Sequence, residues 1–193
     1  MDTKTRLIRT MQQALARQGF HGMGLTDLLA KADTAKGAMY HHFPGGKTQL
    51  AVAAIVATVD GIVLSFSASL KQSPDLVKNL RHWLNGAGAY LAYSAFESGC
   101  PLATIALETT PKDTELRTAI ALGFATIRDA MAGAFAANGI PLDRAERIAA
   151  VFMASYEGGL MQARVAQELK SLEACNDQLL EWLSFELSKV GKL

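Results

Sequence analysis

The chain has 193 residues, half of them hydrophobic, and 32 of them are alanine. Alanine favours helix more than any other residue, so the composition excludes a disordered chain and disfavours an all-β one. The longest stretch without Asp, Glu, Lys or Arg is 82–96, 15 residues, which is shorter than the roughly 20 that cross a bilayer, so we expect no membrane span.

The net charge of +1 conceals an asymmetry along the chain. Residues 1–50 carry seven Lys and Arg against three Asp, whereas residues 51–193 carry twelve basic against fifteen acidic residues. A basic end on a neutral or acidic body is typical of a nucleic-acid-binding head, although inert surfaces show a similar excess. The two cysteines and the charged N-terminus predict a cytoplasmic protein without a disulfide framework or secretory signal.

The first fifty residues predict three short helices. Apolar residues recur at four-residue spacing from Leu7 to Leu15, and Gly19 ends this first helix. Two further short helices, at 25–32 and 35–42, are joined by a tight turn, and a proline followed by two glycines terminates the second.

The rest of the chain predicts longer helices, because apolar residues keep the helical period and Pro, Gly and Ser-Pro-Asp signals separate them. We find no alternating strand pattern and no repeat. The expected fold is therefore all-α with about nine helices, a three-helix head at 1–50 and a helical-bundle body at 51–193. Six further helices are expected after the three of the head, and the first of them begins at the end of the head. They span 47–70, 75–99, 101–108, 113–137, 141–169 and 172–190.

Residues 24–43 predict a helix-turn-helix, whose second helix enters the major groove of DNA. In that helix Lys36 supplies charge, Tyr40 a hydroxyl, and the two histidines further donors. Gly37 inside it costs roughly 1 kcal/mol relative to alanine, and close approach to a phosphate is one reason to accept that cost. Lys47 stands at the start of a helix, where exposed N–H groups already favour a phosphate. From spacing alone, a pair of ordinary short helices with a solvated lysine is an equal alternative.

Residues 36–47, Lys-Gly-Ala-Met-Tyr-His-His-Phe-Pro-Gly-Gly-Lys, resemble the signature of the TetR/AcrR family of bacterial transcriptional regulators. That signature reads approximately K-G-[ST]-[LIM]-Y-H-H-F, then a short break and a lysine. The resemblance covers residues 4–50 closely. Residues 99–102 and 156–160 are similar to the branch related to the lincomycin-resistance repressor LmrA. The DNA-binding residues that the resemblance implies are Thr26, Thr34, Ala35, Lys36, Gly37, Ala38, Tyr40, His41, His42 and Lys47.

Three departures from the family pattern concern this head. The turn usually holds Gly then Val, whereas this chain has Asp33 and Thr34, so Asp33 has to tolerate a left-handed conformation and an apolar anchor is lost. Met23 and Gly24 replace the usual Thr-Ser, and Ala38 replaces a frequent Ser or Thr. We therefore expect weaker phosphate anchoring and a stronger dependence on dimerisation.

For the body, the resemblance implies a ligand pocket and a dimer interface made by the last two long helices. Gly158 and Gly159 inside a helix independently favour close approach of a partner helix, although a bulky side chain of the same subunit is the alternative. The expected interface residues are Gly158, Gly159, Met161, Leu179 and Leu183. The candidate pocket residues are Phe66, Trp83, Tyr90, Tyr93, Phe96, Phe124, Met131, Phe135, Met153 and Tyr156.

The sequence contains no residue pattern that is typical of an enzyme active site or a metal site. His41 and His42 are adjacent and point about 100° apart on a helix, which makes them poor co-ligands, and Cys100 has no neighbouring base in the sequence. We expect no catalytic residue, no metal and no cofactor. The expected function is a dimeric regulator, a repressor by family habit, that binds a palindromic double-stranded operator and is released by a small apolar ligand. The alternative is a helical ligand-binding dimer whose degenerate head no longer binds DNA.

Overall fold

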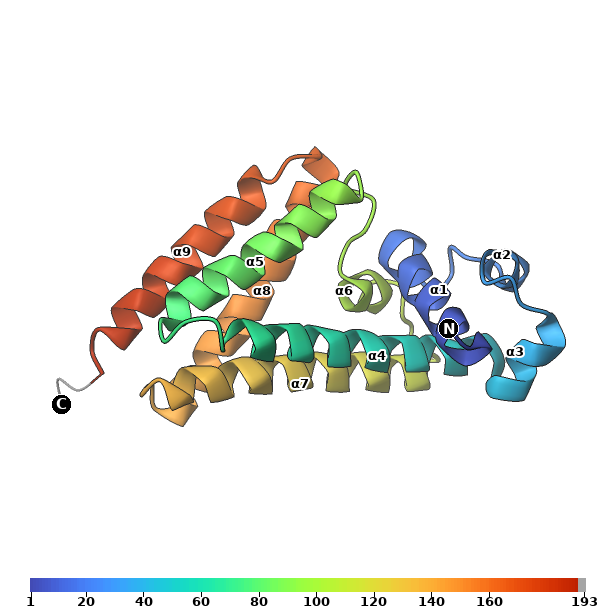
Figure 1. Cartoon of the computed structure of the whole chain (residues 1–193), viewed down its shortest axis with the longest axis horizontal. Helices are drawn as coiled ribbons and strands as arrows, with labels where there is room; N and C mark the ends of the chain where they lie inside the picture. The colour runs from blue at the N-terminus through green and yellow to red at the C-terminus, as the bar shows by residue number, and fades with distance from the viewer. Residues whose placement is uncertain (191–193) are drawn as a thin grey trace. The chain divides into compact units, whose positions relative to one another are not determined.

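The computed structural model describes residues 1–190, and within them every regular element is an α-helix (Figure 1). The all-α prediction is confirmed, and the last three residues of the expected 51–193 body lie outside the described residues. The nine helices of the described chain are α1 (Thr3–Gln18), α2 (Leu25–Lys31), α3 (Lys36–His42), α4 (Gly46–Ser69), α5 (Leu76–Tyr93), α6 (Pro101–Ala106), α7 (Thr114–Ala137), α8 (Leu142–Ala166) and α9 (Lys170–Leu187).

The chain forms two compact units that are discontinuous in sequence. One unit comprises residues 1–60 and 98–124, and the other comprises residues 61–97 together with the chain from 125 onward. Two of the three boundaries fall inside α4 and α7, so both helices contribute to both units. The N-terminal unit therefore contains α6, which the sequence pattern had grouped with the body.

In the N-terminal unit, α1 is the central helix. The Asp2 side chain caps it by accepting a hydrogen bond from the Thr5 N–H at 2.7 Å, and Gly19 ends it at a φ of 73°. Its apolar side chains, including Leu7, Met11 and Leu15, are buried. α1 contacts α2, α3 and α6, so it anchors the two short helices that follow it.

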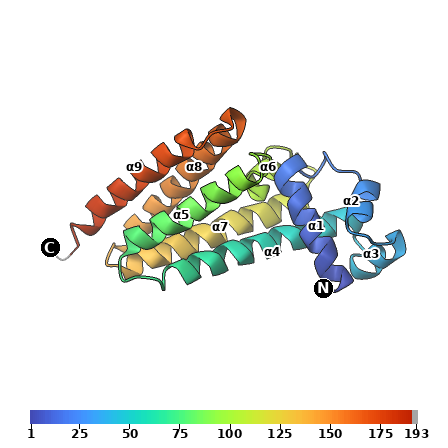
Figure 2. The ribbon, with the colours of Figure 1, turned by 45° about the horizontal axis from the view of Figure 1, so that its top comes forward.

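In the C-terminal unit, α8 and α9 form an antiparallel hairpin and α5 packs on α9 (Figure 2). Leu172, Leu179 and Leu183 lie on the buried face of α9 at helical spacing. Phe135 of α7 and Phe152 of α8 are fully buried, and their ring centroids are 5.8 Å apart. These contacts form the core of this unit.

α5 ends at Tyr93, whereas the sequence pattern extends it to residue 99. Ala95 and Phe96 adopt φ values of 53° and 60°, which no α-helix can contain. Neither is glycine or asparagine, the residues that usually mark a left-handed position. The sequence therefore carries no sign of this break.

By length and composition alone, α4 and α7 could each cross a membrane, with best-window mean hydropathies of 2.1 and 1.3. However, Asp60 in α4 and the Arg128-Asp129 pair in α7 are charges that cost free energy in hydrocarbon. Of these windows, 33% and 44% are buried inside the protein. Length and composition alone do not distinguish a membrane span from a core helix.

Candidate nucleic-acid interface

α3 presents two faces of different character. Met39 is completely buried and Phe43, four residues on, is 2% exposed, so this face holds the helix on the N-terminal unit. Lys36, Gly37 and Tyr40 lie on the opposite, exposed face, together with His41. The spacing of these four residues places a charge, bare backbone, a phenol and an imidazole side by side.

Gly37 is not required by packing inside the chain. A Cβ built there would meet no atom within 4 Å, so the glycine leaves its backbone open to solvent. An alanine would fit this space and would favour helix by roughly 1 kcal/mol. Gly37 therefore suits close approach of a second molecule to the α3 backbone.

Tyr40 is oriented by the glycine that opens α4. Gly46 has a φ of 68°, and a Cβ there would lie 3.4 Å from the Cε1 atom of Tyr40. The ring thus rests on Gly46, while 41% of the residue stays exposed. Next to it, the rings of His41 and His42 meet edge to face with centroids 5.2 Å apart. The exposed face of α3 is held in a defined geometry.

Lys47 already has partners inside the unit. Its ammonium donates hydrogen bonds to the carbonyls of Phe20 and Met23 and lies 4.4 Å from the centroid of the Phe20 ring. Burial lowers the pKa of Lys47, and the nearby Glu108 carboxylate opposes that shift. Lys47 therefore fixes the loop between α1 and α2, and a phosphate contact would compete with these bonds.

Glu108 holds the same loop from the other side. Its Oε2 accepts hydrogen bonds from the backbone N–H groups of Phe20, at 2.9 Å, and His21, at 3.0 Å. Gly19 has a φ of 73° and a ψ of −170°, a backbone conformation that is essentially restricted to glycine. Sequence reasoning missed this role, since the contact joins residues 88 positions apart.

Arg6 of α1 binds the turn between α2 and α3. Its Nε donates to the Ala32 carbonyl at 2.7 Å, and one terminal nitrogen donates to the Asp33 carbonyl at 3.1 Å. The same nitrogen reaches the Thr34 hydroxyl at 3.4 Å, and that hydroxyl donates to the Ala32 carbonyl at 2.9 Å. Thr34 is thus engaged within the turn. Asp33 has a φ of 44°, as expected from the sequence.

The remaining candidates for DNA contact lie around α2 and α3. Thr26 is exposed in the first turn of α2, and Ala35 is exposed at the start of α3 without a side-chain cap. Ala38 and His42 are half-buried. Thr26 and Ala35 are therefore open to a partner, whereas Ala38 and His42 are only partly exposed.

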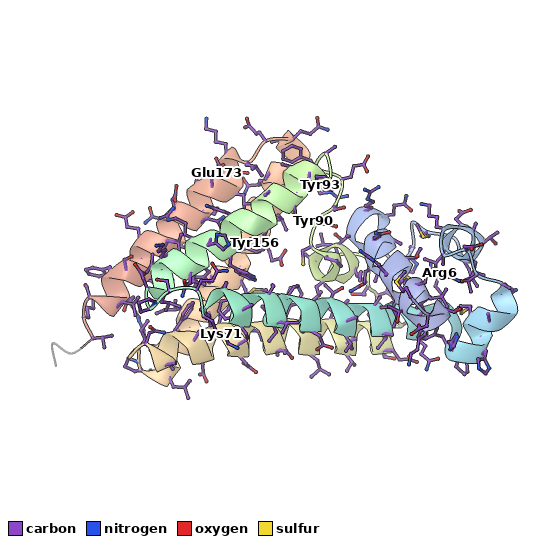
Figure 3. The ribbon with its side chains drawn as sticks, viewed as in Figure 1. Arg6, Lys71, Tyr90, Tyr93, Tyr156 and Glu173 are labelled. Carbon is purple, nitrogen blue, oxygen red and sulfur yellow. The ribbon has the colours of Figure 1, made fainter. Side chains whose placement is uncertain are left out.

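The pocket candidates differ widely in exposure, and they do not all belong to one unit. In the C-terminal unit, Phe66 and Trp83 meet edge to face with centroids 5.2 Å apart. Tyr90 is 57% and Tyr93 89% exposed, and both lie towards the C-terminal end of α5 (Figure 3). Tyr93 therefore cannot line an internal cavity, because α5 turns it to solvent. Met131 and Phe135 are buried, Phe96, Met153 and Tyr156 are half-buried, and Phe124 belongs to the N-terminal unit.

Asn176 is a polar residue that sequence reasoning missed. It lies on the buried face of α9 between Leu172 and Leu180, and 6% of it is exposed. Its Oδ1 has no hydrogen-bond partner among the described residues, which is costly for a buried acceptor. A single asparagine in a leucine stripe is the sequence signal that could have identified it.

The predicted interface residues fall into two groups. A Cβ at Gly159 would lie 3.2 Å from Cys175 and Leu172 of the same chain, whereas one at Gly158 would meet no atom within 4 Å. Gly159 therefore lets α9 of the same chain approach α8 closely, and Leu179 and Leu183 are buried within the chain as well. Gly158 and Met161, which is 56% exposed, face outward.

Comparisons with known proteins agree on one family. Residues 8–54 match the family model described as bacterial regulatory proteins, tetR family. Residues 77–178, more than half of the chain, match the model of the transcriptional regulator LmrA/YxaF-like C-terminal domain. The N-terminal match contains all of α2 and α3, and the C-terminal match contains all of α6, α7 and α8.

Two relatives and one solved structure illustrate the similarity. The chain is 28% identical to the HTH-type transcriptional regulator Rv0196 of Mycobacterium tuberculosis, over 95% of each chain. It is 24% identical to the HTH-type transcriptional regulator LmrA of Bacillus subtilis, over 93% of this chain and 97% of LmrA. The crystal structure of a regulatory protein TetR from Rhodobacter sphaeroides, 22% identical, superposes with a TM-score of 0.80 over 92% of this chain and 96% of that one.

Proposed function

Because the chain belongs to the TetR family of transcriptional regulators, in its LmrA/YxaF-like group, we propose that it represses transcription as a dimer on a palindromic operator and is released by a small, mainly apolar effector. Its family and relatives are transcriptional regulators rather than enzymes. The ligand-responsive repressor is the typical role in this family. We also propose that the protein acts in the cytoplasm, where such DNA-binding regulators typically work.

The exposed face of α3 is the observation that carries this proposal. Lys36, Tyr40 and His41 provide donors for phosphate and base edges, and Gly37 lets the backbone approach them. The buried Met39 fixes the helix beneath them. The Thr34 hydroxyl and the Lys47 ammonium already donate hydrogen bonds to backbone carbonyls of the same unit, so a DNA contact from either group would compete with these bonds.

The outward face of α8 supports the proposed dimer. Val151, Gly158, Met161 and Val165 recur at helical spacing, and the three larger residues are 47%, 56% and 82% exposed. On α9, Phe185 is 60% exposed. A dimer made through this apolar surface would carry two α3 helices, and binding of both to successive major grooves, about 34–36 Å apart, would require a palindromic operator.

The effector site lies in the C-terminal unit in this proposal. The orphaned Oδ1 of Asn176, surrounded along α9 by leucines, supports an apolar ligand that carries one hydrogen-bond donor. Such a ligand lowers the affinity for DNA at most by the ratio of its own affinities for two arrangements of the dimer, the one that does not bind DNA and the one that does.

The test compares two exposed lysines. Lys36→Ala, on the recognition face, should weaken binding to a palindromic duplex selected on the wild-type protein from a random pool, by about tenfold or more. It should also lower the slope of log affinity against log salt by about one for each subunit. The matched control is Lys71→Ala, in the C-terminal unit (Figure 3), which should bind as wild type.

Dimerisation should be the same for both variants and for wild type in analytical ultracentrifugation. Failure to select any duplex on the wild-type protein would reject the proposal and favour the degenerate-head alternative. Equal losses for the Lys36 and Lys71 variants would reject α3 as the recognition helix.

A further inference from the structure

The turn between α2 and α3 contains a residue in a strained backbone conformation. Asp33 N–H bonds the Ala30 carbonyl at 3.1 Å and Thr34 N–H bonds the Leu29 carbonyl at 3.0 Å, which is the Schellman pattern at a helix C-terminus. In this pattern the residue at the Asp33 position is left-handed and is usually glycine. Here a residue with a Cβ holds a φ of 44°, a conformation that costs free energy.

Arg6 compensates for this strain from a different helix. Its guanidinium spans the carbonyls of Ala32 and Asp33, at 2.7 and 3.1 Å, and these groups lie where α2 can no longer satisfy them. Its positive charge also sits at the negative end of the α2 dipole. The planar fork matches two adjacent acceptors in a way that the single ammonium of lysine cannot.

The position of α3 depends on this turn. α3 has seven residues, one buried side chain, Met39, and no side-chain cap at its first turn. Its N-terminal half, with Lys36 and Gly37, is therefore held mainly through the turn that Arg6 binds. α1, in contrast, is fixed by a long buried face that includes Leu7 and Met11.

We infer that Arg6 is a positioning residue for DNA recognition: it sets the orientation of α3 through the α2–α3 turn and does not itself bind DNA. This inference rests on the proposed DNA-binding function. Loss of the Arg6 guanidinium hydrogen bonds lowers the fraction of N-terminal units in which α3 has the orientation that binds DNA. The apparent affinity for DNA falls by the same factor. A dimer that needs both heads loses that factor squared.

The experiment measures affinity for the selected palindromic duplex over a range of salt, well below the unfolding temperature. Arg6→Lys, which keeps the charge, should weaken binding by about tenfold per head, and so by about 100-fold for the dimer, with the salt slope unchanged. Arg6→Met should give a similar loss and the same slope. The matched control is Arg9→Lys, an exposed arginine on the same helix, which should stay within about twofold of wild type.

A rescue separates positioning from simple loss of folding. Asp33→Gly removes the strain at the left-handed position, so Arg6→Lys with Asp33→Gly should regain most of the lost affinity, while Asp33→Gly alone should bind at least as well as wild type. Wild-type affinity in Arg6→Lys would overturn the inference, as would absence of rescue. A salt slope lowered by about one per subunit in Arg6→Met would assign Arg6 to a direct phosphate contact instead. Failure of the wild-type protein to bind any duplex would count against the proposed function, and this result differs from all three.

Discussion

Glu186 joins the two ends of the α8–α9 hairpin. It is 8% exposed, and its carboxylate accepts hydrogen bonds from Arg144 at 2.7 Å and from the indole of Trp182 at 3.2 Å. Lys189 adds a third partner at 3.3 Å. The hydrogen bond from Arg144 is the main cause that holds the pKa of Glu186 below its ordinary value, and Lys189 acts in the same direction.

This carboxylate makes the stability of the hairpin depend on pH. Because the pKa of Glu186 is lower in the folded chain, its contribution is fully present above the unfolded-state pKa of about 4.3 and is lost as the pH falls through the lower folded value. Glu186→Gln should therefore reduce the free energy of unfolding by about 1–2 kcal/mol at pH 7. Urea unfolding curves of variant and wild type should converge at acid pH, as the pH falls through the lowered pKa that Glu186 has in the folded chain.

Exposed Glu181 on the same helix offers the control. Its change to glutamine should leave the unfolding midpoint almost unaltered at both pH values. If the difference in free energy of unfolding between wild type and Glu186→Gln stays constant down to acid pH, the carboxylate charge is not what stabilises the hairpin.

At the scale of helices, the two adjacent glycines of α8 have different tasks. Gly159 lets α9 approach, since its Cβ position lies 3.2 Å from Cys175 and Leu172. Gly158 faces away from the chain's own core. Two identical substitutions one residue apart therefore distinguish folding from association.

Gly159→Leu should overpack the α8–α9 contact and lower the free energy of unfolding by about 1–3 kcal/mol. Gly158→Leu should leave the fold of the subunit intact and weaken dimerisation by about tenfold or more, because the new side chain stands in the proposed interface. Thermal unfolding monitored by circular dichroism and sedimentation at several concentrations measure both effects. A fully dimeric Gly158→Leu protein would place the interface elsewhere.

Most of the helices could be predicted from sequence because they carry a repeating apolar face and a clear end signal. Gly19 ends α1 and the two glycines after Pro44 separate α3 from α4. The end of α5 could not be predicted, since Ala95 and Phe96 adopt left-handed conformations without a residue type that marks them.

The exposed donors of α3 could be predicted as well, because they depend on a local motif. The long-range hydrogen bonds that hold the neighbouring turn and loop could not be predicted. Arg6 binds a turn 26–28 residues away and Glu108 binds a loop 87–88 residues away, and no periodicity connects such pairs. For the same reason, helical spacing could not separate buried Phe135 from exposed Tyr93 among the aromatic candidates.

For the whole molecule, the charge asymmetry of the sequence has a structural counterpart. The basic first fifty residues form most of the N-terminal unit, and α3 presents its exposed donors from that unit. The segment 98–124 belongs to the same unit through contacts of α6 and Glu108 with α1 and its following loop. A part of the chain matched by the LmrA/YxaF-like C-terminal model therefore supports the DNA-binding head directly.

In the proposed function, α3 recognises DNA in a dimer with two heads. The most direct measurement is the affinity of the full chain for a palindromic duplex selected on it, compared with a scrambled duplex of equal length, by fluorescence anisotropy over a range of salt. We expect two subunits per duplex, a preference for the palindrome of about a thousandfold or more, and affinity that falls steeply with salt. Equal binding of both duplexes, or none to either, would contradict the account.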